Sequence, residues 1–92
     1  MADSVQRARA IIDSEADALR AIPLDDHFEK AIRVLECCKG KVITTGLGKA
    51  GTIAQKVAGT LCSTGTPACF LHPAEAAHGD LGLLDRGDVI VA

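Results

Sequence analysis

Hydrophobic residues recur every three or four positions over the first 22 residues, which predicts an amphipathic helix. Its apolar stripe runs from Val5 to Ile22. Asp3 or Ser4 is expected to cap its start, because short polar side chains accept hydrogen bonds from the first free N–H groups of a helix. Pro23 is expected to stop it, since proline has no N–H to donate.

The same spacing returns after the proline and predicts a second helix. This helix is expected to begin after Asp25 or Asp26, and Asp26 followed by Glu29 resembles a capping box. Gly40 is expected to end it. Residues 1–40 are thus expected to form a helical segment, whose second helix presents the apolar positions Phe28, Ala31, Ile32, Leu35 and Cys38.

The period of the pattern changes after Gly40. Short apolar runs, each with strand-forming residues, predict three strands at 41–45, 68–71 and 88–92. Residues 46–51, GLGKAG, are expected to form a glycine-rich turn. Helical spacing returns over residues 52–64 and ends at Gly65. The stretch between the second and third strands leaves room for only one or two helical turns.

A strand, a helix and a second strand in succession predict a parallel unit. Residues 41–92 are therefore expected to form an α/β core with the first strand in the middle, in the order 2-1-3 of flavodoxin-like sheets. We interpret residues 1–92 as the front part of a larger, doubly wound, three-layer sandwich. The reason is that a buried parallel strand needs neighbours on both sides and cover on both faces.

Composition narrows the classes of function. The chain has 92 residues, 48% of them hydrophobic, and a net charge of −2 with both signs mixed along it. No basic patch predicts nucleic-acid binding, and no apolar run approaches the roughly 20 residues that cross a bilayer. The charged N-terminus is unlike a signal peptide, so we expect a cytoplasmic protein. The four cysteines are expected to be reduced and buried, because no pair has C-x-x-C spacing.

Gly46, Gly48 and Gly51 fit the pattern G-x-G-x-x-G between a strand and a helix. The helix N-terminus offers free N–H groups and a positive dipole to an anion. Lys49 either adds a cation beside that anion or is a solvated lysine on a turn. A dinucleotide site needs an acidic residue at the end of the next strand, where this chain has His72. NAD and ATP are therefore disfavoured, and a smaller anionic ligand stays open.

Residues 72–80, HPAEAAHGD, put two histidines, a glutamate and an aspartate into one short stretch. Three interpretations are open: a polar turn, a structural zinc site, or part of a ligand site. A closed zinc site is disfavoured, since this combination of histidines and carboxylates is not a usual ligand set. The carboxyl ends of parallel strands meet at one edge of a sheet, so this stretch and the glycine loop are expected to line the same site.

The stretches TTGLGKAG, STGTPACFLHPAEAAHGDLG and DVIVA together resemble the sugar isomerase (SIS) domain of bacterial arabinose 5-phosphate isomerases. The resemblance covers residues 5–92, and the run S-T-G-T-P before H-P-x-E-A-x-H-G-D carries most of its specificity. It implies an enzyme that interconverts ribulose 5-phosphate and arabinose 5-phosphate through an enediol, in the synthesis of the lipopolysaccharide sugar Kdo. It also implies a small sugar-phosphate ligand and no required cofactor.

The resemblance further implies roles for individual residues. Lys49 matches the family's catalytic lysine, although Ala50 stands where many relatives have serine. His72 matches a histidine that contacts the substrate and binds a divalent metal, usually an inhibitory zinc. The substrate-binding residues that the resemblance implies are Gly48, Lys49, Gly65, Thr66, His72, Glu75 and His78.

In the family, a serine-rich phosphate loop follows the third strand, and two glutamates and a histidine of the active site lie further on. We expect these parts to lie beyond Ala92, so that this chain alone carries only part of an active site and is inactive. The alternative function is a phosphosugar-binding regulatory module of the same fold, without turnover. The third strand presents an exposed edge, which predicts a homo-oligomer joined through residues 88–92 or through the first two helices.

Overall fold

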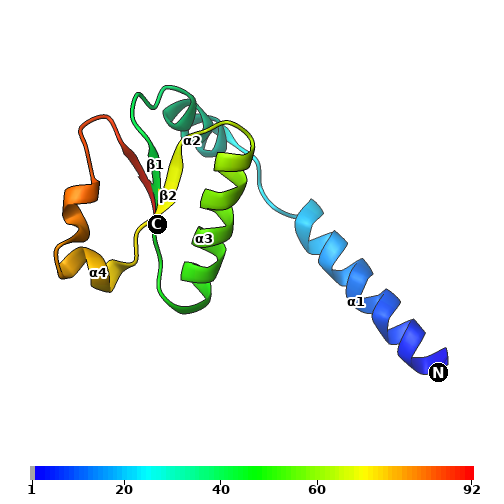
Figure 1. Ribbon diagram of the computed structural model, residues 1–92. Helices are drawn as coiled ribbons and strands as arrows, with labels where there is room; N and C mark the ends of the chain where they lie inside the picture. Colours follow the sequence, from blue (N-terminus) through cyan, green and yellow to red (C-terminus); the bar gives the residue numbers. More distant parts are fainter. Residues whose placement is uncertain (1) are drawn as a thin grey trace.

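The structure, a computed structural model, describes residues 2–92. Its elements are the helices and strands α1 (Ala2–Arg20), α2 (Asp26–Glu36), β1 (Val42–Thr44), α3 (Gly48–Ser63), β2 (Ala68–Phe70), α4 (Pro73–Ala77), the 3-10 helix η1 (Asp80–Leu83) and β3 (Val89–Val91). Figure 1 shows that α1 extends away from an α/β body formed from β1 onward. No helix within this described part of the chain is both long and apolar enough to span a bilayer.

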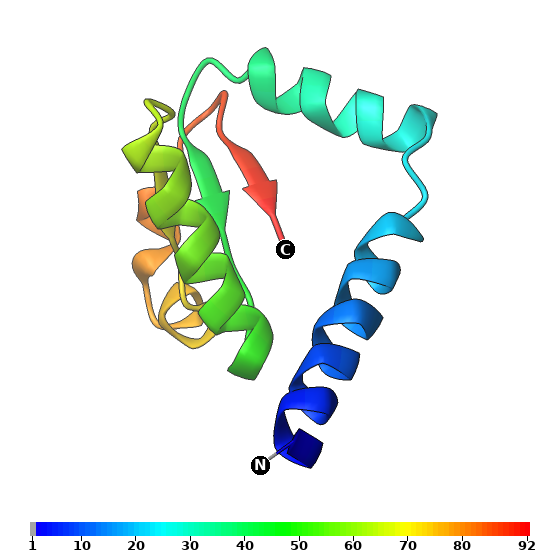
Figure 2. The same cartoon turned by 90° about the vertical axis from the view of Figure 1, so that its right-hand side faces the viewer.

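The three strands form one parallel sheet in the order β2-β1-β3. Ile43 of the central strand is paired with Cys69 on one side and with Ile90 on the other. In the two views of Figures 1 and 2, α3 covers one face of the sheet, and the segment of α4 and η1 lies on the other side. The predicted α/β class, the parallel strands and their order are confirmed.

The buried core is small and lies where α3 packs on the sheet. Val42 and Ile43 are 1% and 0% exposed, and small alanines of α3 pack in the same core. Burying a valine or isoleucine side chain contributes about 1.5–3 kcal/mol. Thr44 is also fully buried, and its hydroxyl donates a hydrogen bond to the carbonyl of Ala54 at 2.7 Å. That bond satisfies the polar group and joins the strand to the helix.

The predicted cap of the first helix and the predicted capping box of the second need correction, whereas the start of the second helix after Asp25 is confirmed. Asp3 and Ser4 lie inside α1, so neither caps it. Asp25, not Asp26, caps α2, because its carboxylate accepts hydrogen bonds from the backbone N–H groups two and three positions on, at 3.0 and 3.4 Å. The capping-box prediction for Asp26 and Glu29 is therefore wrong by one position. A carboxylate one residue earlier reaches the free N–H groups better.

The predicted end of the second helix is also wrong. α2 ends at Glu36 with Cys37 as its cap, rather than at Gly40. Gly40 instead lies so close to Asp88 that a Cβ on this glycine would clash with the aspartate carboxylate. The glycine is thus explained by a close approach to the start of β3, since any larger residue would displace Asp88.

The expectation of buried cysteines is wrong. Cys37 and Cys62 are exposed, Cys38 and Cys69 are half-buried, and all four are free thiols. Two of the sulfurs have backbone acceptors: the thiol of Cys62 donates to the carbonyl of Ala68 at 3.0 Å, and that of Cys38 lies 3.4 Å from the carbonyl oxygen of Gly87. The hydrophobic composition favours buried thiols, yet none of the four is fully buried. The reason is that α1 and α2 do not cover the sheet.

Ion pairs hold the amino ends of β1 and β3 together. They join Lys41 to Asp85 and Asp88. The Lys41 ammonium lies 2.8 Å from Asp88 Oδ2 and 3.2 Å from Asp85 Oδ2. The Asp88 carboxylate also accepts hydrogen bonds from the backbone N–H groups of Lys41 and Asp85, at 2.9 and 2.8 Å. The lysine ammonium, helped by these N–H groups, lowers the pKa of Asp88 to about 2. The same contact raises the pKa of Lys41.

Candidate functional site

The glycine loop joins β1 to α3 and is shorter than predicted. α3 begins at Gly48 rather than at residue 52, so only Thr45, Gly46 and Leu47 separate the strand from the helix. The first and third glycines of the motif are in contact: a Cβ on Gly51 would lie 2.5 Å from the carbonyl oxygen of Gly46. Glycine at both positions therefore lets the loop fold back onto the first turn of α3.

Gly48 and Lys49 occupy that first turn. The N-cap residue, Leu47, makes no side-chain hydrogen bond to the helix, so its first N–H groups have no side-chain acceptor from the cap. Lys49 is exposed, and no carboxylate of residues 2–92 forms an ion pair with it. Uncapped N–H groups, the helix dipole and a free ammonium together favour an anion at this end of α3.

Two hydrogen bonds tie the end of β1 and the glycine loop to Leu71, the residue after β2. The N–H of Leu71 donates to the carbonyl of Thr44 at 2.8 Å. The hydroxyl of Thr45 donates to the carbonyl of Leu71 at 2.5 Å. Leu71 is buried, and His72 follows it directly, so the start of the His-rich stretch is fixed beside the loop. The prediction that both segments lie at one edge of the sheet is confirmed.

The His-rich stretch forms α4 and the turn after it. This confirms the prediction of one or two helical turns between the second and third strands. His72 caps α4, because its Nδ1 accepts a hydrogen bond from the N–H of Ala74 at 3.1 Å. Its ring also meets Phe70 edge to face, with the ring centroids 6.3 Å apart. Glu75 lies in the first turn and His78 at the other end of this five-residue helix. All three predicted ligand residues are exposed.

The described residues do not fit a metal centre by themselves. A neutral imidazole has one acceptor nitrogen, and in His72 that nitrogen already serves Ala74. A metal on either ring nitrogen would therefore break the cap of α4. Within residues 2–92, no group of three or more His, Cys, Asp or Glu is placed to hold a metal ion. A zinc site needs about four ligands, of which this chain could supply His72.

The structure separates Gly65 and Thr66 from the other predicted site residues. α3 has 16 residues, so it carries the chain about 24 Å, from the carboxyl edge of the sheet back to the amino edge. Gly65 has a φ of 96°, and the N–H of Thr66 donates to the carbonyl of Leu61 at 2.8 Å. This is a helix-ending motif that favours glycine. Neither residue lies near a ligand bound at the glycine loop of the same chain.

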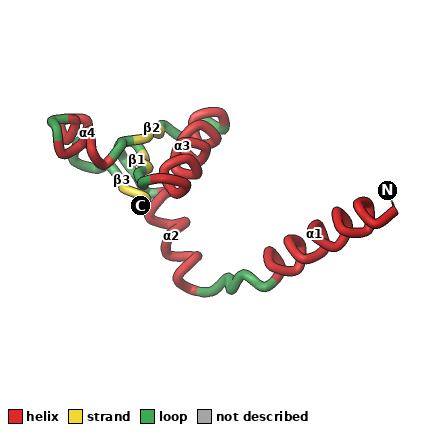
Figure 3. Tube along the Cα trace, turned by 90° about the horizontal axis from the view of Figure 1, so that it is seen from below, coloured by secondary structure: helices red, strands yellow, loops and turns green. Residues whose placement is uncertain are grey.

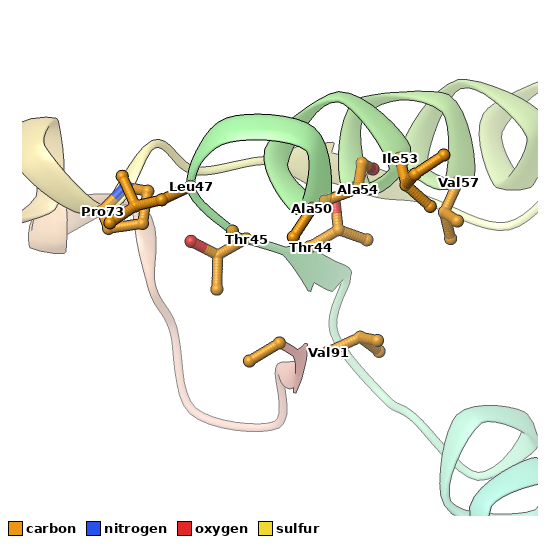
Figure 4. A pocket seen from close by; sticks show the side chains of 11 residues that line it. Thr44, Thr45, Leu47, Ala50, Ile53, Ala54, Val57, Pro73 and Val91 are labelled. Atoms are coloured by element: carbon orange, nitrogen blue, oxygen red, sulfur yellow. Dashed lines mark hydrogen bonds between the residues drawn. The ribbon is translucent and has the colours of Figure 1, made fainter.

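A cavity of about 600 Å³ lies beside the glycine loop, between the start of α3 and the carboxyl ends of β1 and β3. Figure 4 shows Leu47 and Pro73 at one end of it and Val57 at the other. Its full lining is Thr44, Thr45, Gly46, Leu47, Ala50, Ile53, Ala54, Val57, Pro73, Val91 and Ala92. None of the charged residues or histidines predicted for the site is among them.

The lining of this cavity is too apolar for a sugar phosphate. Its two hydroxyls, on Thr44 and Thr45, already donate to backbone carbonyls. A phosphate and several sugar hydroxyls need donors and acceptors that are not already paired. Lys49 and His72, which do not line the cavity, carry polar groups of this kind at the same edge of the sheet. The cavity was not predicted, because helical spacing does not show that Ile53 and Val57 are left 65% and 38% exposed.

The sequence is similar to curated arabinose 5-phosphate isomerases. The arabinose 5-phosphate isomerase KdsD of Pseudomonas aeruginosa is 44% identical over 92 residues, which is 98% of this chain and 28% of that protein. The arabinose 5-phosphate isomerase GutQ of Escherichia coli K12 is 53% identical over 68 residues, which is 74% of this chain and 21% of that protein. The chain thus spans about a quarter of the length of these curated relatives.

Solved structures show the same fold. A Bacteroides fragilis protein described as a phosphosugar isomerase involved in capsule formation has a TM-score of 0.88 and 44% identity, over 95% of this chain and 47% of that one. An Escherichia coli CFT073 protein in complex with arabinose 5-phosphate has a TM-score of 0.84 and 41% identity, over 97% and 48%. The family profile described as "SIS domain" matches residues 34–92. The match covers more than half of the chain, which therefore belongs to the SIS domain family.

Proposed function

We propose that the chain is the amino-terminal part of an arabinose 5-phosphate isomerase, which interconverts ribulose 5-phosphate and arabinose 5-phosphate. The observation that carries the proposal is the start of α3: an uncapped helix end with a free lysine, fixed beside His72 by the bond between Thr45 and Leu71. Such an end attracts the charge of a sugar phosphate. The names of the relatives, and the arabinose 5-phosphate bound to the Escherichia coli neighbour, support this substrate.

The chemistry assigns different tasks to these residues. Isomerisation moves a proton between C1 and C2, so it needs a base, a group that stabilises the developing oxyanion, and an anchor for the phosphate. Lys49 stabilises the oxyanion or other negative charge of the substrate. His72, whose Nδ1 is held by Ala74, presents its Nε2–H to a sugar hydroxyl. Glu75 and His78 contact the sugar from α4.

The remaining parts of the reaction lie outside this set. The base and the serine-rich phosphate loop of the family belong to residues after Ala92 in this proposal. Gly65 and Thr66 contact a substrate only if it is bound by a neighbouring copy, since α3 separates them from Lys49. The whole protein acts in the cytoplasm, where free thiols persist, and makes the precursor of the lipopolysaccharide sugar Kdo.

No metal is required in this proposal, and zinc acts as an inhibitor that competes with Ala74 for His72. Chelation with EDTA should leave the rate unchanged. Added zinc should lower the rate more strongly as the pH rises, because a metal competes with protons for the ring nitrogen. Zinc inhibition that persists in His72→Ala would place the metal elsewhere.

A hybrid enzyme tests the function. In it, this 92-residue chain replaces the aligned part of the Pseudomonas aeruginosa isomerase, and the conversion of ribulose 5-phosphate is followed. The proposal predicts turnover by the hybrid and none by the 92-residue chain alone. A folded hybrid that binds arabinose 5-phosphate in calorimetry without turnover would favour the regulatory module. A folded hybrid that neither binds nor converts the sugar would contradict both functions.

A further inference from the structure

An aromatic side chain lies beside His72, although aromatic residues are rare in this chain. The sequence has two phenylalanines, Phe28 and Phe70, and no tyrosine or tryptophan. Phe28 belongs to α2 and is 50% exposed, whereas Phe70 is the last residue of β2 and is half-buried. Phe70 makes the edge-to-face contact with the imidazole of His72. One of the two aromatic rings is thus placed next to a residue of the candidate site.

Phe70 also lies against the start of α3. It is paired with Thr44 in the sheet, so the two side chains are on the same face, and Thr44 faces α3 through its bond to Ala54. The ring atom Cζ of Phe70 is 3.8 Å from the position that a Cβ on Gly51 would occupy. Figures 1 and 3 show β2 beside α3 and the chain running on to α4 on the side away from α3. Phe70 therefore contacts both segments that form the candidate site.

Two contacts hold the imidazole of His72. Its Nδ1 accepts a hydrogen bond from the N–H of Ala74 at 3.1 Å, which leaves Nε2 to carry the proton of the neutral ring. A single hydrogen bond at one atom does not by itself fix the plane of a ring. The ring of Phe70, with its centroid 6.3 Å away and its plane at 86° to the imidazole, restricts that plane from the sheet side.

We propose that Phe70 is a positioning residue of the sugar-phosphate site, which holds the His72 imidazole with its Nε2–H directed at the substrate. This role rests on the proposed function, in which that N–H meets a sugar hydroxyl. Because Phe70 also packs near Gly51, in the helical turn that carries Lys49, it sets the imidazole relative to this turn. The role requires a ring at the end of β2, whereas packing alone requires only an apolar side chain.

Proton NMR of the 92-residue chain tests the contact independently of turnover. Phe70→Leu keeps an apolar side chain on β2 but removes the ring, so the ring-proton signals of His72 should shift as the ring current is lost. Phe28→Leu is the matched control and should leave these signals in place, and the signals of His78 should stay unchanged in both variants. Signals of His72 that do not shift in Phe70→Leu would overturn the proposal.

Circular dichroism checks that the variant keeps the fold of the wild type. Should Phe70→Leu unfold the chain, Phe70→Met is measured in its place, because methionine is apolar and adapts to the shape of the space it fills. The same shift of the His72 signals is expected in Phe70→Met, and its absence would equally contradict the proposal.

Kinetics of the hybrid enzyme test whether the contact matters to the substrate. Phe70→Leu should raise KM for the sugar phosphate about two- to tenfold, the scale of one aromatic pair, with kcat changed less than about twofold because Lys49 stays in place. In the His72→Ala background the same substitution should raise KM no further, because the residue that it positions is gone. An equal rise in both backgrounds would show that Phe70 acts through the fold, which contradicts the proposal.

Failure of the proposed function would give a different result. A wild-type hybrid that neither binds nor converts the sugar would contradict that function. The NMR comparison would still decide whether Phe70 holds the ring of His72.

Discussion

The two ends of the same three-stranded sheet use their charged residues in opposite ways. At the amino end, Lys41 and Asp88 bind each other, and the Asp88 side chain is only 4% exposed. At the carboxyl end, Lys49 and His78 are exposed, and Lys49 has no ion-pair partner in residues 2–92. We infer that the two ends have different roles: the charged residues of the amino end stabilise the fold, and those of the carboxyl end are free to bind a ligand.

The backbone shows the same division. At the amino end, Gly40 makes room for Asp88, so that the turn before β3 closes on β1. At the carboxyl end, contact between Gly46 and Gly51 folds the loop onto the first turn of α3, whose N-cap residue, Leu47, makes no side-chain hydrogen bond. Glycine therefore allows a close approach at both ends, but only the carboxyl end has a helix start without a side-chain cap. Substitutions at the two ends should consequently affect different properties.

The largest expected effect is on turnover. In the hybrid enzyme, Lys49→Met should lower kcat by roughly 10² or more, which is the scale of losing one preorganised electrostatic donor. Steady-state kinetics measures it, with Lys56→Met as the control, since Lys56 is also an exposed lysine of α3. Near-normal turnover in Lys49→Met would reduce Lys49 to a surface lysine.

A second prediction concerns the glycine contact. Gly51→Ala puts a Cβ 2.5 Å from the oxygen of Gly46, so the loop must move, and unfolding free energy should fall by about 1–3 kcal/mol. Gly59→Ala, in the same helix, meets nothing within 4 Å and should raise it by about 0.5–1 kcal/mol. Urea denaturation measures both. Equal effects of the two substitutions would show that the contact is not restrictive.

The third prediction concerns acid stability. The pKa of Asp88 falls on folding from its ordinary value of 3.8 to about 2, mainly because of the Lys41 ammonium. Its contribution is therefore complete above about pH 4 and is lost as the pH falls towards 2. The urea midpoint of the wild type should exceed that of Asp88→Asn at pH 6, and the difference should shrink between pH 4 and pH 2. A difference that stays constant would contradict this assignment.

The smallest expected effect is at Thr45. Thr45→Val removes the hydrogen bond to the Leu71 carbonyl, worth about 0.5–1.5 kcal/mol, and loosens the placement of His72. We expect a small loss of stability and a higher KM of the hybrid for the sugar phosphate. Thr52→Val is the control, because its hydroxyl makes only an exposed 3.4 Å contact within α3. An unchanged KM would show that this hydrogen bond does not affect the placement of His72 against the substrate.

Periodicity and glycine placement predicted the architecture. The β-branched run at Val42–Thr44 and the glycine pattern after it fixed the parallel unit and the edge that carries Lys49 and His72. Helix ends were harder, because Asp25 and Asp26 are chemically alike and only backbone geometry decides which one caps α2. The prediction of buried thiols was wrong as well, because hydrophobic composition does not show which faces of the helices and the sheet are covered by another element.

The sequence predicted at which edge of the sheet the site lies, but not the contacts that each site residue makes. The resemblance grouped Gly65 with Lys49, but the length of α3 separates them, and Gly65 has a local role in ending that helix. Sequence patterns do not show that His72 caps α4, because the bond to Ala74 depends on the turn that places the ring. Distances across an element and side-chain orientation were thus the missing information.

Measuring both turnover and stability for one substitution at each end tests most directly whether the two ends of the sheet have these separate roles. In the hybrid enzyme, kcat and the urea midpoint at pH 7 are measured for Lys49→Met and for Asp88→Asn. We predict that Lys49→Met loses turnover and keeps the wild-type midpoint, whereas Asp88→Asn lowers the midpoint and keeps its turnover while folded. If Lys49→Met instead loses stability with turnover intact, or Asp88→Asn loses turnover with stability intact, the carboxyl end is not the ligand-binding end.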